Sequence, residues 1–313
     1  MIYLIGNGGM SKEYIKILSK IKIPFKIIGN SVETCKLFMM KTGLQAIPGG
    51  DQTINEMHFE PHDKIIIAVP VERLLNTTNL VLQSGGTAIL TEKPVGLYLN
   101  EIEALKDKAK SLGAKIYAAY NRRFYSSVIV AQSLINDDGG IQSISFDFTE
   151  WSDEIAKIKQ SEVSLNRWVL SNSSHVLDLA FYFAGRPIKM SSHSSGVLNW
   201  HESSTFCGAG ITDRNVLFNY CANWDSAGRW RLELHTKKRK LVFSPMEQLH
   251  VVERGSIALN KIAVDDRLDQ DFKPGLYLQT EAFLNEKAHN QLCSLDDHVK
   301  NFTYYQKIAG YKP

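Results

Sequence analysis

A glycine-rich segment near the N-terminus has the spacing of a phosphate-binding turn. Gly6-x-Gly8-x-x-Ser11 directly follows the apolar run Ile2–Ile5 and leads into a helical pattern. Gly6 permits a tight turn, Gly8 lets the backbone approach a pyrophosphate, and Ser11 is small enough for the helix to contact the strand. A helix that begins here points free N–H groups and its positive dipole end at phosphate. The segment predicts a dinucleotide site, and an ordinary glycine turn in another α/β protein is the alternative.

The end of the second predicted strand bears on the choice of dinucleotide. NAD-binding folds place a carboxylate there for the ribose 2′-hydroxyl, but this chain has Gly29, Asn30 and Ser31. Without a carboxylate nothing repels the 2′-phosphate of NADP, and no arginine stands in this stretch to attract it. The expected cofactor is therefore NAD or NADP, with the choice open.

The first 120 residues alternate between short apolar runs and helical patterns. Uninterrupted apolar strands separated by helices predict a doubly wound parallel sheet, that is, an α/β Rossmann domain. The predicted strands are residues 2–5, 25–28, 65–69, 88–90 and 115–119. The predicted helices are the one that follows the glycine turn and ends at residue 18, then 32–41, 72–83 and 100–112.

The pattern changes after Asn121, and strands then follow one another. The expected second domain is α+β with a large, mostly antiparallel open sheet. Its predicted strands are residues 143–151, 204–211, 215–224, 230–236 and 240–243, within a strand-rich stretch from 191 to 264. Its predicted helices are residues 127–135, 174–183, 276–286 and 295–308. We expect domains at 1–120 and 121–313, and allow for the closing helices to pack back on the first.

Composition excludes several classes of protein. The 313 residues carry 36 Lys and Arg against 33 Asp and Glu, so the net charge of +3 does not suggest a nucleic-acid partner. The dense basic run at 237–240 is predicted to be a solvated hairpin turn. The four cysteines are far apart, and no apolar stretch approaches the ~18 residues of a membrane span. We therefore expect a cytoplasmic protein with no metal site and no membrane partner.

Three motifs together are specific. They are Thr-Glu-Lys-Pro at 91–94, Asn-Arg-Arg-Phe at 121–124 and Ser-His-Val-Leu-Asp at 174–178. Their order and placement resemble the Gfo/Idh/MocA family of oxidoreductases, and the resemblance covers nearly the whole chain, including residues 293–301. It implies a Rossmann domain, a C-terminal domain with an open sheet, and hydride transfer between NAD(P) and a sugar, cyclitol or sugar-nucleotide carbon.

The resemblance also implies roles for single residues. Lys93 matches the family lysine that contacts the reacting substrate oxygen, His175 matches the family acid/base, and Pro70 borders the nicotinamide. The chemistry agrees, because oxidising a secondary alcohol needs a base for the hydroxyl proton and a cation for the developing alkoxide. The alternatives without a catalytic role are that Lys93 is a solvated loop residue and that His175 is a structural histidine.

The chain departs from the family in two places. Ser171 stands where the family often has an aspartate four residues before the histidine, and residues 71–74 lack the Asn and His that often follow Pro70. The expected cofactor contacts are Gly6, Asn7, Gly8, Gly9, Met10, Asn30, Ser31, Val69, Pro70, Glu92, Lys93 and Pro94. The expected substrate contacts are Lys93, Asn121, Arg123, Arg167, Asn172 and His175.

The predicted function is that of an NAD(P)-dependent dehydrogenase or reductase acting on a sugar or nucleotide-sugar carbon. The resemblance extends to a place in surface-glycan biosynthesis. A sugar epimerase with tightly held cofactor and a non-catalytic NAD(P)-binding regulator are the alternatives. We expect a homodimer or homotetramer formed through the C-terminal sheet.

Overall fold

The computed structural model describes residues 1–285 and 290–312, so the predicted end of a helix at Glu286 lies outside the described residues. The chain folds into two compact units. The first comprises Met1–Asn121 and Asp271–Lys300, and the second comprises Arg122–Gln270 and Asn301–Pro313. Among the described residues, each unit contains one sheet.

The sheet of the first unit is parallel except at one edge. Its strands are β1 (Ile2–Ile5), β2 (Phe25–Ile28), β3 (Lys64–Ile67), β4 (Ala88–Thr91), β5 (Lys115–Ala118) and β14 (Cys293–Ser294). Their order is β14-β5-β4-β3-β1-β2, and only β14 runs antiparallel to its neighbour. β1 and the last three residues of β3 are buried, as expected for strands covered on both faces.

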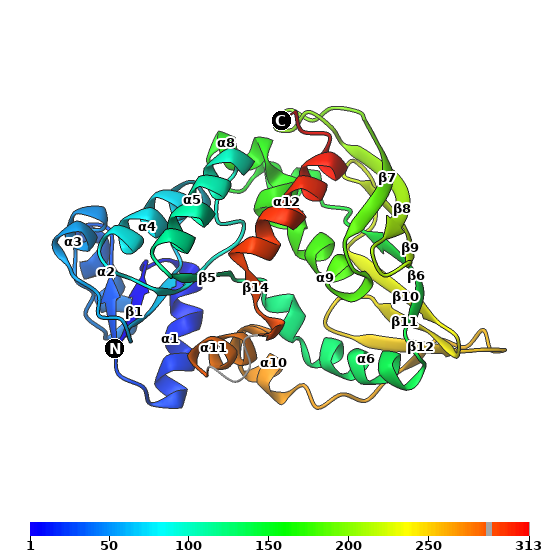
Figure 1. Ribbon diagram of the computed structural model, residues 1–313, viewed down its shortest axis with the longest axis horizontal. Coiled ribbons are helices and arrows are strands. Elements are labelled where there is room, and N and C mark those ends of the chain that lie inside the picture. Colours follow the sequence, from blue (N-terminus) through cyan, green and yellow to red (C-terminus); the bar gives the residue numbers. More distant parts are fainter. Residues whose placement is uncertain (286–289, 313) are drawn as a thin grey trace. The chain divides into compact units, whose positions relative to one another are not determined.

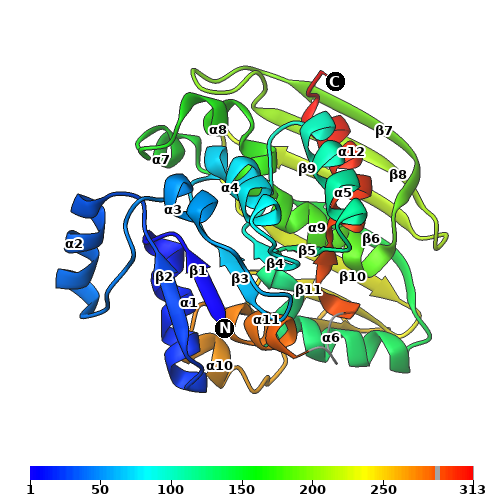
Figure 2. The ribbon, with the colours of Figure 1, turned by 60° about the vertical axis from the view of Figure 1, so that its left-hand side comes forward.

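Helices cover both faces of this sheet, as Figures 1 and 2 show. α4 and α5 lie on one face, and α1 and α11 pack together on the other. The helices of this unit are α1 (Gly9–Ile21), α2 (Val32–Thr42), α3 (Asp51–Glu56), α4 (Val71–Gln83), α5 (Leu99–Ser111) and α11 (Leu276–Leu284). The Rossmann arrangement predicted from the sequence is confirmed, and α3 is a helix that the sequence analysis did not predict.

Strand register gathers the loops of the first unit. Ile5 pairs with Ile28 on one side and with Ile67 on the other, and Ile67 in turn pairs with Thr91. Because these strands are parallel and end level with one another, the segments that follow them emerge at one edge of the sheet. That edge is where α/β folds of this kind bind their ligands.

The second unit contains a larger sheet of the predicted mostly antiparallel kind. Its strands are β6 (Ile141–Asp147), β7 (Pro187–Ser195), β8 (Thr205–Thr212), β9 (Leu217–Asn223), β10 (Arg231–Thr236), β11 (Arg239–Phe243), β12 (Leu249–Glu253) and β13 (Asn260–Lys261). The order is β13-β12-β11-β10-β6-β9-β8-β7, with β6 and β9 as the parallel pair. Buried and exposed residues alternate strictly along β9, so one face of the sheet packs and the other is open.

Helices cover the packed face of the second sheet. α9 (Ser174–Ala184) lies against β6 and β10, and α6 (Ser126–Asp137) against β12 (Figure 1). The other helices of this unit are α7 (Ser152–Ala156), α8 (Glu162–Asn166) and a π-helical turn, η2 (Val169–Ser173). Three elements fall at the divisions between the units: η1 (Asn121–Phe124), α10 (Arg267–Asp271) and α12 (Leu295–Ala309).

The strand predicted at 143–151 is wrong at its C-terminal end. The structure ends β6 at Asp147, whose side chain accepts a hydrogen bond from the backbone N–H of Thr149 at 2.7 Å. This local Asx contact turns the chain out of the strand, and Trp151 then precedes α7. The turn frees Glu150 from sheet pairing.

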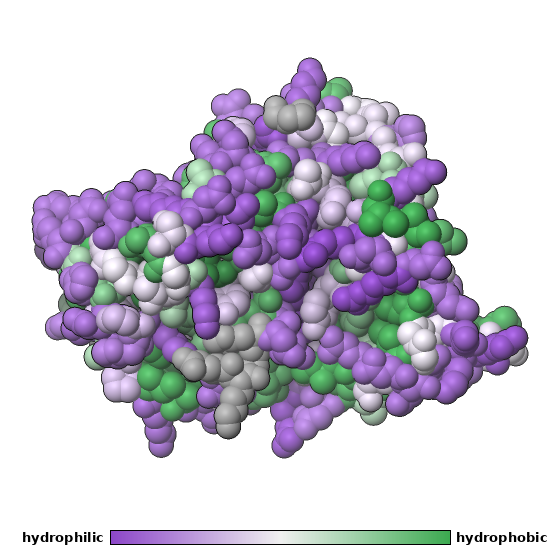
Figure 3. All heavy atoms as spheres, in the orientation of Figure 1, coloured by the Kyte–Doolittle hydropathy of each residue, from purple (hydrophilic) through white to green (hydrophobic). Residues whose placement is uncertain are grey.

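The predicted hairpin turn lies between β10 and β11, but it comprises only residues 237–238 of the basic run, because Arg239 and Lys240 belong to β11. Lys238 lies 3.7 Å from Asp138, and Lys240 lies 3.4 Å from Glu233, so neighbouring carboxylates balance its charge. The face in Figure 3 is mostly hydrophilic, with hydrophobic residues in scattered groups. Within the described ranges, no helix combines the length and hydropathy needed to cross a membrane.

Candidate active site

Gly6 holds the turn after β1 in a conformation that only glycine adopts easily. Its φ is +119°, and a Cβ on it would collide with the backbone carbonyl of Ala68, just after β3. Ser11 donates a hydrogen bond to that same carbonyl at 3.4 Å. The turn is therefore pinned to the end of β3, and Asn7 contacts the Cys35 sulfur at 3.8 Å.

Gly8 has the opposite surroundings. A Cβ on Gly8 or on Gly9 would meet no protein atom within 4 Å, and both residues are exposed. Gly8 precedes α1, no side chain caps the helix, and its first turn, which includes Met10, contains no acidic residue. Uncapped N–H groups beside open space fit a pyrophosphate, which needs close backbone approach and a positive field.

The end of β2 contains a feature that the sequence analysis missed. Arg73 of α4 donates a hydrogen bond from Nη1 to Asn30 Oδ1 at 2.7 Å, and from Nη2 to Asp51 Oδ1 at 2.7 Å. Ser31 instead caps α2 through a reciprocal bond with Thr34. An arginine and a carboxylate therefore lie beside Asn30, although neither stands in the stretch at 29–31. The only sequence signal at Arg73 was that it belongs to the segment 71–74, which departs from the family pattern.

The Lys93 loop follows β4 and is strained. Lys93 and Pro94 are both buried, and Val95 has φ +70°, a left-handed conformation that a β-branched residue rarely adopts. His298 Nε2 lies 2.7 Å from the Pro94 carbonyl oxygen, which holds the loop against α12. Backbone strain of this kind persists only where surrounding contacts enforce it, and it is often found at functional sites.

Glu92 connects the Lys93 loop to α1, the helix that follows the glycine turn. The Tyr14 hydroxyl donates a hydrogen bond to Glu92 at 2.9 Å. Burial raises the pKa of Glu92, while the Tyr14 bond and the charges of Lys93 and Lys273 act in the other direction. Val69 and Pro70 follow β3, and Pro70 directly precedes α4. The sheet edge thus brings together the segments predicted to contact the cofactor.

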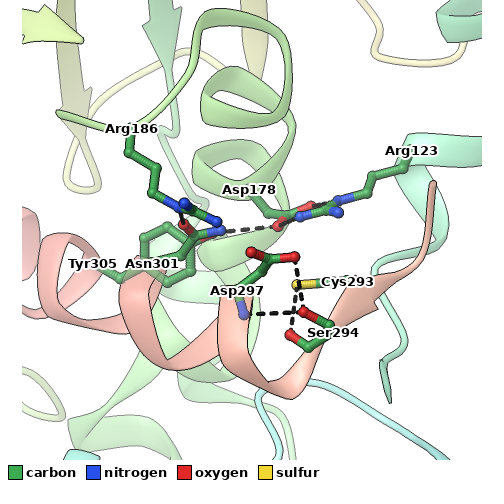
Figure 4. A network of polar contacts seen from close by, with 8 residues as sticks. All are labelled: Arg123, Asp178, Arg186, Cys293, Ser294, Asp297, Asn301 and Tyr305. Carbon is green, nitrogen blue, oxygen red and sulfur yellow. Dashed lines mark hydrogen bonds and ion pairs between the residues drawn. The ribbon is translucent and has the colours of Figure 1, made fainter. Parts of the chain in front are cut away.

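Asn121 closes β5 and is engaged within the first unit. Its amide donates to the Pro274 carbonyl at 2.8 Å, and the residue is buried. Also in this unit, Ser294 and Asp297 exchange hydrogen bonds at the start of α12, beside Cys293 (Figure 4). These contacts make Asn121 and the closing segment structural anchors in this unit.

His175 lies in the first turn of α9, directly after the π-helical turn η2. Short π-helical segments are rare and often occur at functional sites. The turn alters the expected relationship with Ser171, whose hydroxyl donates to the Ser164 carbonyl at 3.0 Å. His175 is buried, and its ring lies 6.4 Å from the Trp230 ring.

Arg123 is held in a buried ion pair within the second unit. Its Nε and Nη2 donate to the two oxygens of Asp178 at 2.8 and 2.6 Å, and Tyr305 lies 3.3 Å from the same carboxylate. Figure 4 shows the two groups face to face, with Arg186 bonded to Asn301 nearby. Because the bidentate geometry occupies Asp178 on both oxygens, Arg123 fixes η1 to α9.

Asn172 and its neighbours surround a buried carboxylate. Glu150 accepts from Asn172 Nδ2 at 2.8 Å, from Ser173 Oγ at 2.8 Å and from Arg229 Nη1 at 2.6 Å. The Glu150 side chain is 1% exposed, whereas that of Arg229 is 45% exposed. Glu150, which follows β6, therefore joins the π-helical turn η2 to Arg229, a contact that sequence spacing did not indicate.

Arg167 precedes η2 and stacks on an aromatic ring of the same unit. Its guanidinium is 4.6 Å above the Tyr311 ring, and the Tyr311 hydroxyl contacts both the Val169 backbone N–H and His201. Burial lowers the pKa of His201 to about 4. Of the four residues predicted for substrate in this unit, Asn172 and His175 adjoin the Glu150 network, while Arg123 and Arg167 are engaged in other contacts.

Comparison with known proteins gives one curated relative. The chain is 25% identical over 197 residues to glucose-6-phosphate 3-dehydrogenase of Bacillus subtilis, which covers 58% of this chain and 53% of the relative. The chain's match therefore spans about half the length of that relative. No protein-family model matches the chain.

Solved structures match over nearly the whole chain. UDP-N-acetylglucosamine 3-dehydrogenase of Acidithiobacillus ferrooxidans has a TM-score of 0.77 at 15% identity, over 99% of this chain and 96% of the other. Levoglucosan dehydrogenase, solved with NADH and L-sorbose, has a TM-score of 0.79 at 16% identity, over 99% and 95%. An oxidoreductase of Desulfitobacterium hafniense, described as putative and NADPH-dependent, has a TM-score of 0.80 at 14% identity, over 99% and 94%.

These likenesses show a shared fold, and the curated relative adds a match in sequence. The two-sheet fold that the resemblance to the Gfo/Idh/MocA family implies is confirmed.

Proposed function

We propose that the chain is an NAD(P)-dependent oxidoreductase that transfers hydride to or from a secondary alcohol or ketone carbon of a sugar or nucleotide sugar. The observation that carries the proposal is the N-terminus of α1. There, uncapped N–H groups and Gly8 lie beside open space at the ligand-binding edge of a Rossmann sheet.

The chain's own residues would divide the work as follows. The α1 N-terminus holds the pyrophosphate, and Gly6 fixes the turn that presents it. Lys93 supplies positive charge where an alkoxide develops on the substrate oxygen, and His175 takes or returns the hydroxyl proton. Bound NAD(P) would supply the hydride acceptor or donor.

The relatives narrow the reacting carbon. The glucose-6-phosphate and UDP-N-acetylglucosamine enzymes are both 3-dehydrogenases by name. We propose carbon 3 of a hexose as the site of reaction in this chain as well, and a place in surface-glycan biosynthesis remains part of the proposal by analogy.

Two residues take roles other than those expected. Arg123 already pairs with Asp178, so we assign it to positioning η1 rather than to gripping substrate. Arg73, beside Asn30, becomes a candidate for the adenosine ribose and its 2′-phosphate.

The test is a panel of hexoses, hexose phosphates and nucleotide sugars incubated with NAD⁺ and with NADP⁺. A dehydrogenase accumulates reduced cofactor, which absorbs at a new wavelength. An epimerase converts the sugar without net change in cofactor, and a regulator binds the dinucleotide without converting any sugar. Binding of neither dinucleotide, measured by calorimetry, would contradict all three functions.

The open face of the second sheet remains our proposed surface for self-association. Leu217 of β9 is 59% exposed and Ile188 of β7 is 69% exposed, and apolar side chains at such positions favour a partner. Sedimentation velocity of the full chain tests this proposal. A dimer or tetramer that dissociates in Leu217→Glu supports it, and a monomer overturns it.

A further inference from the structure

Aromatic rings and guanidinium groups alternate in the second unit. Arg229 lies 4.9 Å from the centre of the Trp151 ring and 4.7 Å from that of Trp230. Arg122 lies 4.6 Å from the Trp230 ring and 5.8 Å from the Tyr125 ring. We refer to these five residues as the Trp–Arg stack. Two cations thus share the Trp230 ring, which is also the ring beside His175.

The two arginines of the stack differ in their compensation. Arg229 is paired with the buried Glu150 carboxylate. Arg122 has no ion pair and its side chain makes no hydrogen bond among the described residues, and its Nε is enclosed without an acceptor. Burial lowers the pKa of the Arg122 guanidinium and the charge of Arg229 lowers it further, while Tyr125, Glu247 and Glu150 act to raise it.

Trp230 provides a second, independent observation. Its ring is buried, and its Nε1–H is enclosed with no acceptor in the part of the chain that the structure describes. Buried indole N–H groups usually have a partner. The stack therefore presents a half-buried guanidinium and an unused N–H donor on stacked groups, and both lack an acceptor of hydrogen bonds.

We infer that the Trp–Arg stack is a subsite for an oxyanion of the substrate, a phosphate or a carboxylate, with Arg122 as its principal ligand. That the anion is part of a substrate rests on the proposed function, whereas the existence of an anion site does not. An oxyanion would compensate the Arg122 charge through charge-assisted hydrogen bonds and accept from Trp230 after small side-chain adjustments. The sugar would then be anchored beside His175 by its acidic group.

The neighbouring charged residues determine which part of the stack can hold an anion. Trp151, at the exposed end of the stack, lines a cavity of about 350 Å³ with Asp153, Glu154, Asp225 and Trp224. Three carboxylates would repel an anion there, and they suit the hydroxyl groups of a neutral sugar that packs on the exposed Trp151 indole. We place the anion at the Arg122 part of the stack, where the carboxylates Glu150 and Glu247 are already engaged by Arg229 and by the Tyr125 hydroxyl.

The experiment follows the Trp230 indole N–H by nuclear magnetic resonance on the full chain without cofactor. The chain has five tryptophans, so Trp230→Phe assigns the resonance. Inorganic phosphate, acetate and chloride are titrated at constant ionic strength. We expect a saturable shift with phosphate or with acetate that chloride does not produce. The phosphate arm identifies a phosphorylated sugar and the acetate arm a sugar acid.

Arg122→Met tests the ligand, because methionine keeps apolar packing against Trp230 while removing the charge. We expect binding of the effective anion to weaken by about tenfold or more. Arg254→Met is the matched control, since it removes an exposed arginine of the same unit and should leave the affinity unchanged. No specific shift with either oxyanion, or an unchanged affinity in Arg122→Met, would overturn the inference.

Binding of NADH at the α1 site is measured separately and distinguishes the two proposals. Anion binding without dinucleotide binding leaves the subsite standing and removes the oxidoreductase. Dinucleotide binding without anion binding does the reverse.

Discussion

Arg73 Nη1 donates to Asn30 Oδ1 over 2.7 Å, which places a guanidinium at the carboxyl end of β2 although 43 residues separate the two. Arg73 also pairs with Asp51 at 2.7 Å. A guanidinium attracts the 2′-phosphate of NADP, whereas a carboxylate accepts from the 2′-hydroxyl of NAD and repels the phosphate. Cofactor choice therefore depends on which member of this pair faces the ribose.

Asp51→Asn should shift cofactor preference toward NADPH, and Arg73→Leu should shift it toward NADH. Each change removes one charged partner, so we expect the ratio of the two affinities to move by about tenfold in opposite directions. Fluorescence titration with NADH and NADPH measures both constants. Glu56→Gln, also on α3, is the control, and an unaltered ratio in both variants would place the ribose elsewhere.

Gly8→Val should weaken dinucleotide binding without unfolding the chain. The side chain would occupy the space beside the α1 N-terminus, where no protein atom lies within 4 Å of an added Cβ. We expect an affinity loss of about tenfold or more by calorimetry, because the backbone could no longer approach phosphate. Gly6→Ala should instead destabilise the fold, since its Cβ would collide with the Ala68 carbonyl. Normal affinity in a folded Gly8→Val chain would contradict the pyrophosphate assignment.

Lys93→Met should reduce turnover while leaving cofactor affinity close to normal. The ammonium is needed mainly where charge develops on the substrate oxygen, so its loss affects the transition state more than binding. A loss of turnover of about 100-fold is the scale for one such donor. Steady-state kinetics with the sugar found in the panel, together with NADH titration, checks both parts. Near-normal turnover would exclude the role given to Lys93.

His175→Asn should remove most of the turnover and leave dinucleotide binding unchanged. Asparagine retains polarity and approximate size but cannot exchange a proton near neutral pH. His193→Asn, an exposed histidine of β7, is the matched control. If the pH profile of His175→Asn kept the same acidic limb as the native chain, another residue would hold the base role.

His201 should make the second unit less stable in mild acid. Burial lowers the pKa of His201 to about 4, below its ordinary value of 6.5, so the unfolded chain takes up a proton first as pH falls. The stabilisation present above pH 6.5 is then lost progressively toward pH 4, by about 2 kcal/mol between pH 7 and pH 5. Urea unfolding at the two pH values measures this change. His201→Gln should reduce the difference in unfolding free energy between the two pH values, and His193→Gln should not. The same difference in the native chain and both variants would refute the assignment.

Local pattern was enough to predict much of this protein. The apolar run Ile2–Ile5 followed by Gly6-x-Gly8 predicted a strand, a turn and a helix, and the structure has β1 and α1 there. Such elements depend on residues close in the chain, because strand burial and turn conformation are set by neighbours. The Lys93 and His175 motifs were likewise readable, and their roles stay predictions.

Tertiary structure alone decided which side chains meet. Asp147 ended β6 early and released Glu150 to Asn172 and Arg229. Arg123 pairs with Asp178, which lies 55 positions away in the sequence. Arg122, and not Arg123, has no carboxylate partner among the described residues. A guanidinium has no preferred partner along the sequence; its partner is the carboxylate or ring that the packing of distant elements places within reach. The spacing of residues in the sequence does not show which distant side chains come within reach of one another, and only the fold does.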